Sequence, residues 1–535
     1  ASPDAAELDL IEGRMAVVPL QNQTGDPAMD EAVLAFEAAA AEAASQVDGG
    51  ELLLVRGSEQ VSAGDSPRAI GAGTGAAMIV AGAISTAGDE VVFQAEIVDP
   101  TDGSTMHVLP PERAPADEAS SAAQRLASRV AGALAMHVDP EWTSPEAHSV
   151  PTIEAYRIVK QGDTLFSQNR QNQSIPVFYE AYEADTTYLL PLFTAAAAHR
   201  NNGRGAIGDS LLDHIEARSH LLTEIERYNL TWFRGSPEEA FRAAQAAREL
   251  DSLGWTYGVG LRANHAGYFA EAVEALSHRA ELAAMGNYSA QTWPAWRGQY
   301  LVALHAVGDH ETELAEARAG NEAYPDNPWW IWSEMRALAG LGEVEQVLAL
   351  VDSAETLLET FENASFFENL EDVGMELKVH GNPEEGQALL EKVIAHYQEI
   401  GNQNQLADAY GFSGRTQEAF EILRSTVSEE SSPDIWGWYG AAAAIIGETE
   451  VAEEVLSRLE ARPDATVGNN LRYRAAIHGA LGRCEQAIQL YRAANDAGFT
   501  YSQAWGGEWW HRDWETEPVR ENCPEFQSLL NKRPG

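Results

Sequence analysis

The spacing of apolar residues in the first part of the chain switches between the periods of strands and of helices. Short apolar runs bounded by Gly, Asp and Pro predict strands, and longer Ala-, Leu- and Glu-rich stretches with helical recurrence predict helices. Their order predicts a small mixed sheet with helices packed on it. The expected strands are residues 15–20, 51–55, 78–84, 90–98 and 105–109, and the expected helices are 28–46, a short stretch from Pro67, and 117–137.

Beyond residue 150 the strand pattern stops and apolar residues recur at helical spacing. Gly or Asn residues interrupt these blocks at steps of 34, 32, 32, 41, 34, 39, 33, 33 and 35 residues. A helix-turn-helix repeat has a period of about 34 residues, so the steps predict helical hairpins. The interrupting residues are Asn169, Gly203, Gly235, Gly267, Gly308, Gly342, Gly381, Gly414, Gly447 and Gly482.

The positions that follow each break carry the residues a helical hairpin needs. Two packed helices need a small residue where they cross and a larger apolar one further along the same face. Five residues after the breaks, eight of ten residues are Gly, Ala or Ser, and nine residues after, all ten are apolar. Glu313 departs from this pattern beside the 41-residue step, which predicts a distorted repeat. The first set is Ser174, Gly208, Ala240, Ala272, Glu313, Val347, Gly386, Ala419, Ala452 and Ala487, and the second is Phe178, Leu212, Ala244, Leu276, Ala317, Val351, Leu390, Leu423, Leu456 and Tyr491.

These patterns divide the chain into four expected parts. Residues 1–138 form the α/β module, the Pro-rich residues 139–150 a linker, residues 151–498 an array of about ten helix pairs, and residues 499–535 a Trp-rich C-terminal cap. The predicted fold class is therefore mostly α: an N-terminal α/β module followed by a right-handed helical-repeat superhelix.

The repeats resemble a known family. The last unit, residues 482–494, is similar to the consensus of tetratricopeptide repeats (TPR) and matches it better than the earlier units do. The resemblance implies a TPR-like superhelix with one concave and one convex wall. Such walls bind proteins or peptides, so the expected partner is a protein or peptide ligand.

The front of the chain resembles a second family. Residues 17–27 read as a strand ending in Pro, then Asn, then Gly-Asp-Pro, and residues 91–103 carry a late hairpin. Over residues 14–138 this is similar to the TolB amino-terminal-like module of bacterial signalling proteins. Joined to the repeats and to a tail around residues 517–530, it resembles the extracytoplasmic half of certain bacterial transmembrane serine/threonine kinases. The kinase domain and membrane helix of that family are absent from this chain, so the resemblance carries over no activity.

That resemblance implies an extracytoplasmic location, periplasmic or extracellular, and a role in signalling. The first residues, Ala1-Ser2-Pro3-Asp4, fit a chain trimmed at a signal-peptidase site or cut from a larger protein. Within the chain, no stretch approaches the about 18 consecutive apolar residues of a membrane-spanning helix. With 82 acidic against 35 basic residues and a net charge of −47, the chain repels nucleic acid and anionic membranes, which we exclude as partners.

No pattern in the sequence predicts catalysis, a cofactor or a metal. His511-Arg512-Asp513 copies part of a kinase catalytic loop, but the other kinase motifs are missing. The 14 His residues show no metal-binding spacing, and Cys484 has no partner base in a nucleophile motif. We therefore expect a protein that is not an enzyme.

The two cysteines, Cys484 and Cys523, leave two alternatives. Cys484 begins the second helix of the last repeat, and Cys523 lies 39 residues later in the expected cap. In an exported chain the two would form a disulfide that stabilises the cap. The alternative is a pair of unpaired, half-buried thiols.

Three Trp-rich clusters are candidate binding anchors, because exposed Trp residues often dominate interface energetics. The competing interpretation for the first two is ordinary core packing, which is common for bulky residues on the first helix of a repeat. The candidates are Trp329, Trp330, Trp332, Trp436, Trp438, Trp509 and Trp510.

Five Asn-x-Ser/Thr triplets are candidate glycosylation sites that export would permit. They begin at Asn22, Asn172, Asn229, Asn287 and Asn363.

The sequence thus predicts an exported, non-enzymatic scaffold or sensor that captures a protein or peptide on its repeats. The alternative is a structural subunit that self-associates into an extracellular filament or surface layer, because an uncapped repeat end is an apolar face that another copy can cover.

Overall fold

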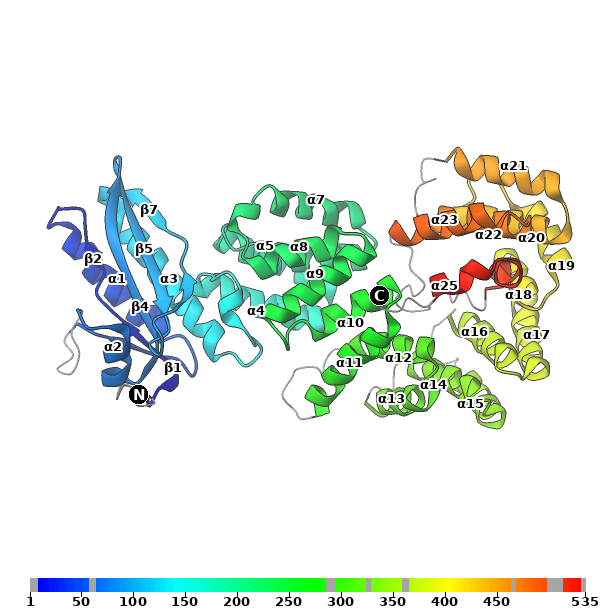
Figure 1. Cartoon of the computed structure of the whole chain (residues 1–535), viewed down its shortest axis with the longest axis horizontal. Coiled ribbons are helices and arrows are strands. Elements are labelled where there is room, and N and C mark those ends of the chain that lie inside the picture. The colour runs from blue at the N-terminus through cyan, green and yellow to red at the C-terminus, as the bar shows by residue number, and fades with distance from the viewer. Residues whose placement is uncertain are drawn as a thin grey trace. The chain divides into compact units, whose positions relative to one another are not determined.

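The computed structural model describes residues 8–56, 64–168, 170–284, 295–323, 329–357, 365–462, 468–497 and 513–530 (Figure 1). The chain folds as two compact units. The predicted fold class is confirmed: the chain is mostly α, with an N-terminal α/β module followed by TPR-like helical repeats. Unit 1 comprises Ala1–Phe233 and Ala246–Gly254, and unit 2 comprises Arg234–Gln245 and Trp255–Gly535.

Unit 1 begins with a mixed sheet. Its strands follow the order β3-β1-β4-β5-β6, while β2 pairs with β4 and β7 pairs with β5. The pairs β1–β3 and β1–β4 are parallel, and β4–β5 is antiparallel. The strands are β1 (Ile11–Val17), β2 (Gln21–Asn22), β3 (Glu51–Leu54), β4 (Ala76–Ala87), β5 (Glu90–Val98), β6 (Thr105–Val108) and β7 (Glu112–Pro115).

The two faces of this sheet are covered by different helices, which are α1 (Met29–Ala44), α2 (Pro67–Thr74) and α3 (Ala119–Val138). Successive side chains of a strand point to opposite faces. Met15 and Val17 accordingly pack in the large core with α1 and α3, whereas Ala16 and Val18 pack in a smaller cluster with Ile70 of α2.

The sheet differs from the sequence prediction at its edges. β2 and β7 were not predicted, because two and four residues are too short to show an alternating pattern. β1 ends at Val17 rather than residue 20. Val18 still donates its N–H to the carbonyl of Val80, but Pro19 has no N–H to continue the ladder.

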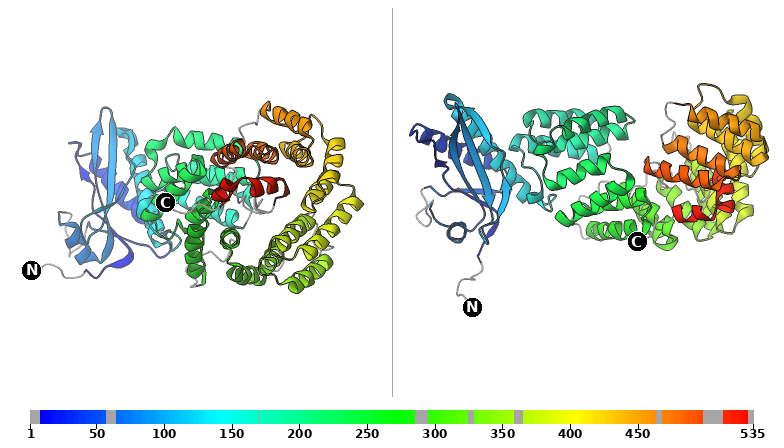
Figure 2. Two further views of the ribbon diagram at one scale, coloured as in Figure 1. Left: turned by 45° about the vertical axis from the view of Figure 1, so that its right-hand side comes forward. Right: turned by 45° about the horizontal axis from the view of Figure 1, so that its top comes forward.

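Most of the remaining described helices form hairpins of a first and a second helix in sequence. In unit 2 we call the first helices inner helices, because three of them contact the C-terminal segment. Within unit 2, a first helix contacts its own second helix and the first helix of the next hairpin (Figure 2). The first helices are α4 (Ile153–Ser167), α6 (Leu190–Asn201), α8 (Glu224–Arg234), α10 (Thr256–Ala266), α12 (Ala295–Val307), α14 (Trp329–Gly340), α16 (Ser365–Val379), α18 (Gln403–Phe412), α20 (Pro433–Ile446) and α22 (Gly468–Ala480). The second helices are α5 (Gln171–Ala184), α7 (Gly205–Glu216), α9 (Pro237–Leu250), α11 (Phe269–Ala284), α13 (His310–Ala323), α15 (Val344–Leu357), α17 (Pro383–Ile400), α19 (Thr416–Thr426), α21 (Thr449–Glu460) and α23 (Cys484–Asp496).

The repeat phase read from the sequence matches the packing. Every residue of the crossing set and of the larger apolar set is buried. The turn residues Gly267 and Gly447 cap α10 and α20 with φ of 83° and 88°, a left-handed conformation that favours glycine. The local sequence therefore fixes both where each hairpin turns and which face it hides.

Residues 139–150, expected to be a linker, are packed in unit 1. Pro145 and Val150 are buried. The carboxylate of Asp139 accepts a hydrogen bond from the Tyr156 hydroxyl and pairs with Lys160 at 3.0 Å. This segment is thus part of the core that joins α3 to α4.

The C-terminal residues 513–530 form short helices inside unit 2: η5 (Trp514–Thr516), α24 (Glu517–Asn522), η6 (Pro524–Phe526) and α25 (Gln527–Leu530). This C-terminal segment contacts α22 and α23, beside which it is drawn in red in Figure 2. Its residues Val519 and Phe526 share one apolar cluster with Leu471 of α22 and with Phe269 and Val302 of the first hairpins of the unit.

In the described ranges, none of the helices combines the length and the apolar character needed to cross a bilayer.

Candidate functional site

The Trp residues singled out from the sequence lie mostly in the core. Trp330, Trp332 and Trp436 are buried, and Trp330 packs with Leu301 and Ala317. Trp329 and Trp438 are half-buried and border core clusters. Trp509 and Trp510 lie outside the described residues. Among these candidates, Trp329 and Trp438 therefore keep part of their surface available to a ligand.

The candidate glycosylation residues have different surroundings. The amide of Asn22 donates to the Asp26 carbonyl and to the Asp30 carboxylate, both at 2.9 Å, which places it in a structured turn before α1. Asn172 is exposed in α5, and Asn229 is half-buried in α8. Asn287 and Asn363 lie outside the described residues.

The inner face of unit 2 holds the C-terminal segment of its own chain. The 3₁₀ turn η5 contacts α18, α20 and α22, which are the inner helices of three successive hairpins. Trp514 is buried there, and its indole N–H donates to Asp408 of α18 at 2.7 Å. Gly411 makes room for this ring, because a Cβ at position 411 would lie 2.4 Å from it.

Two further contacts anchor the same segment. A Cβ on Gly479 of α22 would lie 2.0 Å from Val519, so the segment fills a hollow left by a missing side chain. The buried guanidinium of Arg472 pairs with the carboxylates of Asp513 and Glu515, each at 3.1 Å. These buried charges are paired, as burial requires.

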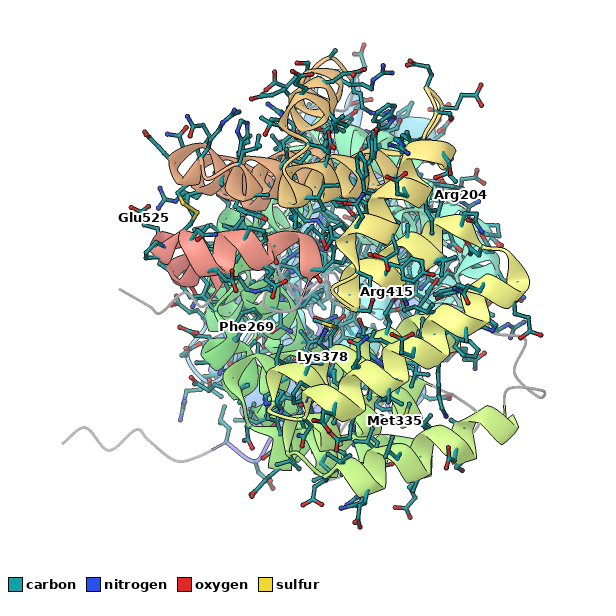
Figure 3. All side chains as sticks on the ribbon, turned by 90° about the vertical axis from the view of Figure 1, so that its right-hand side faces the viewer. Arg204, Phe269, Met335, Lys378, Arg415 and Glu525 are labelled. Atoms are coloured by element: carbon teal, nitrogen blue, oxygen red, sulfur yellow. A yellow bond between two sulfur atoms is a disulfide. The ribbon has the colours of Figure 1, made fainter. Side chains whose placement is uncertain are left out.

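The structure joins Cys484 of α23 and Cys523 by a disulfide, with 5.4 Å between the Cα atoms. The bond is visible near the labelled Glu525 in Figure 3. It ties the C-terminal segment covalently to the last repeat.

A second cluster, wholly inside unit 2, consists of buried titratable groups around Glu313. His305, on α12, and His310, on α13, each place Nδ1 3.0 Å from Oε2 of Glu313. The other carboxylate oxygen, Oε1, accepts from Nε and Nη2 of Arg336, on α14, at 2.9 and 2.8 Å. We call these four residues and Glu376 of α16 the Glu313 cluster.

Glu376 extends the cluster on the far side of His305. Its Oε2 lies 3.3 Å from Nε2 of His305 and 3.4 Å from Nε2 of His380. Both carboxylates and the Arg336 guanidinium are fully buried, whereas the His380 side chain is 31% exposed. The cluster therefore approaches the surface near His380.

The charges of the cluster shift two pKa values. Burial opposes the charged form of His305, but the carboxylates of Glu313 and Glu376 outweigh it and raise its pKa above the ordinary value. Burial alone would raise the pKa of Glu313, yet His305 and Arg336 hold it well below its usual range. Glu313 is thus a carboxylate anion at zero solvent exposure.

The atoms of His305, His310 and Glu313 that could bind a metal ion all lie within 4.8 Å of one another. Sequence reasoning missed this cluster, because its members come from four helices and match no metal-binding motif. The one signal was Glu313 at a crossing position otherwise taken by small or apolar residues. The sequence interpretation was a distorted repeat beside the 41-residue step, part of which lies outside the described residues; Glu313 itself lies in α13, a helix of 14 residues.

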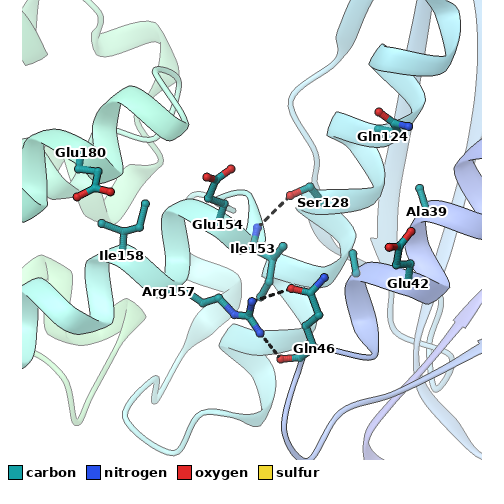
Figure 4. Close-up of a pocket in the computed structure, with 11 residues that line it drawn as sticks. Ala39, Glu42, Gln46, Gln124, Ser128, Ile153, Glu154, Arg157, Ile158 and Glu180 are labelled. Carbon is teal, nitrogen blue, oxygen red and sulfur yellow. Dashed lines mark hydrogen bonds between the residues drawn. The ribbon is translucent and has the colours of Figure 1, made fainter.

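Unit 1 carries a polar groove of about 600 Å³ between α1, α3, α4 and α5 (Figure 4). Arg157 lies in it and donates to the side-chain and backbone oxygens of Gln46, both at 2.7 Å. Three carboxylates line the same groove: Glu42, Glu154 and Glu180. Because Arg157 hydrogen-bonds to Gln46, the residues of the groove mainly connect the α/β module to the first hairpin.

No protein-family model matches the chain. No curated protein matches it either. Among solved structures, it is similar to a human IFIT1 dimer with PPP-AAAA, at 15% identity over 62% of this chain and 88% of that chain, with a TM-score of 0.28. It is also similar to the P58(IPK) TPR domain (15% identity, 71% and 100% covered, TM-score 0.19) and to Naa15/Naa10 bound to HypK-THB (14% identity, 76% and 64% covered, TM-score 0.25). Likeness at this level says nothing of ligands.

Proposed function

We propose that this protein is a non-enzymatic scaffold that holds a protein or peptide on the inner face of its TPR-like repeats. The observation that carries the proposal is the C-terminal segment itself, which lies along the inner helices α18, α20 and α22. Small residues on those helices leave hollows, and Trp514 and Val519 fill them. The face is therefore suited to hold a peptide through side-chain anchors.

We further propose that the chain works outside the cytoplasm as a sensing part of a signalling protein. The resemblance of residues 14–138 to the TolB-like module supports this role, as does that of the whole chain to the kinase extracytoplasmic half. The disulfide between Cys484 and Cys523 supports the location, because such bonds persist in oxidising compartments.

Site-specific photo-crosslinking in the native host tests the binding role. Trp329 of α14 and Trp438 of α20 are half-buried, so a benzoylphenylalanine residue at either position keeps a partly exposed aromatic ring on a first helix of the repeats. We expect each variant to form a discrete crosslinked product with a second protein. Val108, which is 77% exposed on the sheet edge, is the matched control position.

Crosslinks at Val108 equal to those at Trp329 and Trp438, or none at any position, would contradict the scaffold function.

The location is tested separately by alkylating thiols in intact cells before lysis. An extracytoplasmic protein should be recovered with Cys484 and Cys523 protected from alkylation, whereas a cytoplasmic one should be modified at both.

The filament alternative has less support from the packing. It requires an uncovered apolar face at the end of the array, but Val519, Cys523 and Phe526 pack on α22 and α23 in one buried cluster. Light scattering of the concentrated protein tests it: a size that grows with concentration would favour assembly, and a constant monomer would favour the scaffold.

A further inference from the structure

Glu313 occupies a position that the repeat pattern reserves for small or apolar residues. The matching positions in the other hairpins include Ala272 and Ala419, which are also fully buried. A buried carboxylate costs free energy unless it is paired and hydrogen-bonded. The chain supplies that pairing through His310 on the same helix and through His305 and Arg336 on α12 and α14. A small or apolar residue at position 313 would pack without any of these polar partners.

Three ligand atoms converge at this position. The Nδ1 atoms of His305 and His310 each lie 3.0 Å from Oε2 of Glu313, and each of the three residues offers a ligand atom within 4.8 Å of those of the other two. Two imidazole nitrogens and one carboxylate oxygen are a ligand set used by Zn²⁺ sites that keep a further coordination position open. Hard cations such as Mg²⁺ and Ca²⁺ prefer all-oxygen sites.

The groups behind these ligands match the outer shell of a metal site. A metal-bound histidine usually donates its second ring N–H to a carboxylate, and Nε2 of His305 lies 3.3 Å from Glu376. A metal-bound carboxylate is usually hydrogen-bonded as well, and Arg336 holds Oε1 of Glu313, which leaves Oε2 directed at the histidines.

The backbone also makes room for one ligand. A Cβ on Gly340, the last residue of α14, would lie 2.7 Å from Cγ and Nδ1 of His310. The imidazole of His310 therefore rests directly on a glycine, which fixes where its Nδ1 points.

We propose that His305, His310 and Glu313 bind a Zn²⁺ ion, with Glu376 and Arg336 as outer positioning residues. Glu313 and Glu376 carry two negative charges against the one positive charge of Arg336, so a cation is favoured here when the histidines are neutral. With the ion bound, His305 coordinates through Nδ1 and donates from Nε2 to Glu376. The proposal is independent of peptide binding.

Zinc binding to the full chain tests the proposal. The protein is stripped with a chelator, and Zn²⁺ affinity is measured by competition with a chromophoric chelator. Co²⁺ serves as a second probe, because its visible absorption reports nitrogen and oxygen coordination. We expect one tight Zn²⁺ site per chain and a Co²⁺ spectrum that Zn²⁺ abolishes.

His310→Ala and His380→Ala form a matched pair. His310 is a proposed ligand, whereas His380 pairs with Glu376 at 3.4 Å and packs edge to face on the His310 ring without being a ligand. We expect the first variant to lose the tight site and the second to keep its affinity within about 3-fold, well under the about 10- to 100-fold loss typical of outer-shell changes.

Two more variants separate coordination from folding. Glu376→Gln should weaken Zn²⁺ binding about 10- to 100-fold while keeping the Co²⁺ spectrum, as expected of a positioning residue. Gly340→Ala leaves every ligand in place but displaces His310, so it should weaken binding in a chain whose circular dichroism is unchanged. Absence of a tight Zn²⁺ site in the native chain, or equal Zn²⁺ affinity in His310→Ala and His380→Ala, would overturn the proposal. The cluster would then be a network of ion pairs and hydrogen bonds without a metal.

Discussion

Arg129 of α3 and Asp185, which follows α5, form a buried two-point ion pair. Nη1 donates to Oδ2 at 2.6 Å and Nη2 to Oδ1 at 3.0 Å, and both side chains are at most 5% exposed. Arg129 also pairs with Glu112 of β7 at 2.9 Å. One side chain therefore links the sheet module to the first helical hairpins of unit 1.

Removing Asp185 should destabilise unit 1 strongly. In Asp185→Ala, the guanidinium of Arg129 loses its bidentate partner while it stays buried, and such a loss typically costs about 3 to 5 kcal/mol. Urea unfolding measures the change. Asp209→Ala is the control: its pair with Arg200 is 52% exposed on the Asp209 side, so the expected cost is below about 1 kcal/mol. Equal costs for both variants would show that Arg129 does not join the two parts.

Acid should destabilise unit 1 through the pair formed by His107 and His137, whose Nε2 atoms lie 3.0 Å apart. Burial, then the charges of His137 and His148, lower the pKa of His107 to about 3, and burial lowers that of His137 to about 4. Below pH of about 6.5, His107 and His137 bind protons in the unfolded chain, whereas in the folded chain they stay neutral until the pH approaches their lowered pKa values. The free energy of unfolding is therefore highest above that pH and falls toward pH 4. The fall is about 1.4 kcal/mol per pH unit for each extra proton that the unfolded chain binds.

The slope of unfolding free energy against pH checks this linkage. His137→Gln removes one of the two titrating rings and should flatten the slope between pH of about 4 and 6.5. His220→Gln changes an exposed histidine and serves as control. An unchanged slope in His137→Gln would mean that this pair does not govern the acid response.

Reducing the disulfide should loosen the C-terminal segment. The bond closes a loop of 39 residues, for which the chain-entropy model gives about 4 kcal/mol of stabilisation. We expect Cys523→Ser to lower the melting temperature and to speed proteolysis within residues 513–530. A reducing agent should shift wild type to the same behaviour and leave Cys523→Ser unchanged; protection of the segment in both would contradict the prediction.

Gly411→Ala should displace Trp514, because the added Cβ would lie 2.4 Å from the indole. The expected result is lost stability and faster hydrogen exchange in the C-terminal segment. Gly205→Ala adds a Cβ in α7 with nothing within 4 Å, so it should be neutral or slightly stabilising. If the two variants behave alike, Trp514 does not anchor the segment.

The repeat array was predictable because its determinants are local. A turn glycine such as Gly447, a small residue five positions later and a larger one nine positions later recur in the sequence and decide how each hairpin closes. The cores around Trp330 and Trp332 illustrate the limit: the sequence favours core packing over ligand anchoring for these residues without excluding either, and their burial places them in the core.

The Glu313 cluster and the placement of the C-terminal segment were not predictable for a different reason. His305, Glu313, Arg336 and Glu376 meet only after three hairpins have stacked, and their spacing along the chain carries no period. Likewise, Trp514 reaches Asp408 across more than a hundred residues. Such contacts depend on how the repeats stack, which no local pattern specifies.

The central claim, that the inner face of unit 2 holds a polypeptide through side-chain anchors, is tested most directly by a peptide titration. The probe is a fluorescein-labelled peptide of residues 513–530 with Ser in place of Cys523, and binding is followed by anisotropy. The receptor is the full chain carrying Cys484→Ser, Trp514→Ala, Cys523→Ser and Phe526→Ala, which weaken its own segment. We predict saturable binding to this variant and at least about 10-fold weaker binding to oxidised wild type, whose tethered segment competes at high effective concentration. Equal binding to both proteins, or binding to neither, would contradict the claim.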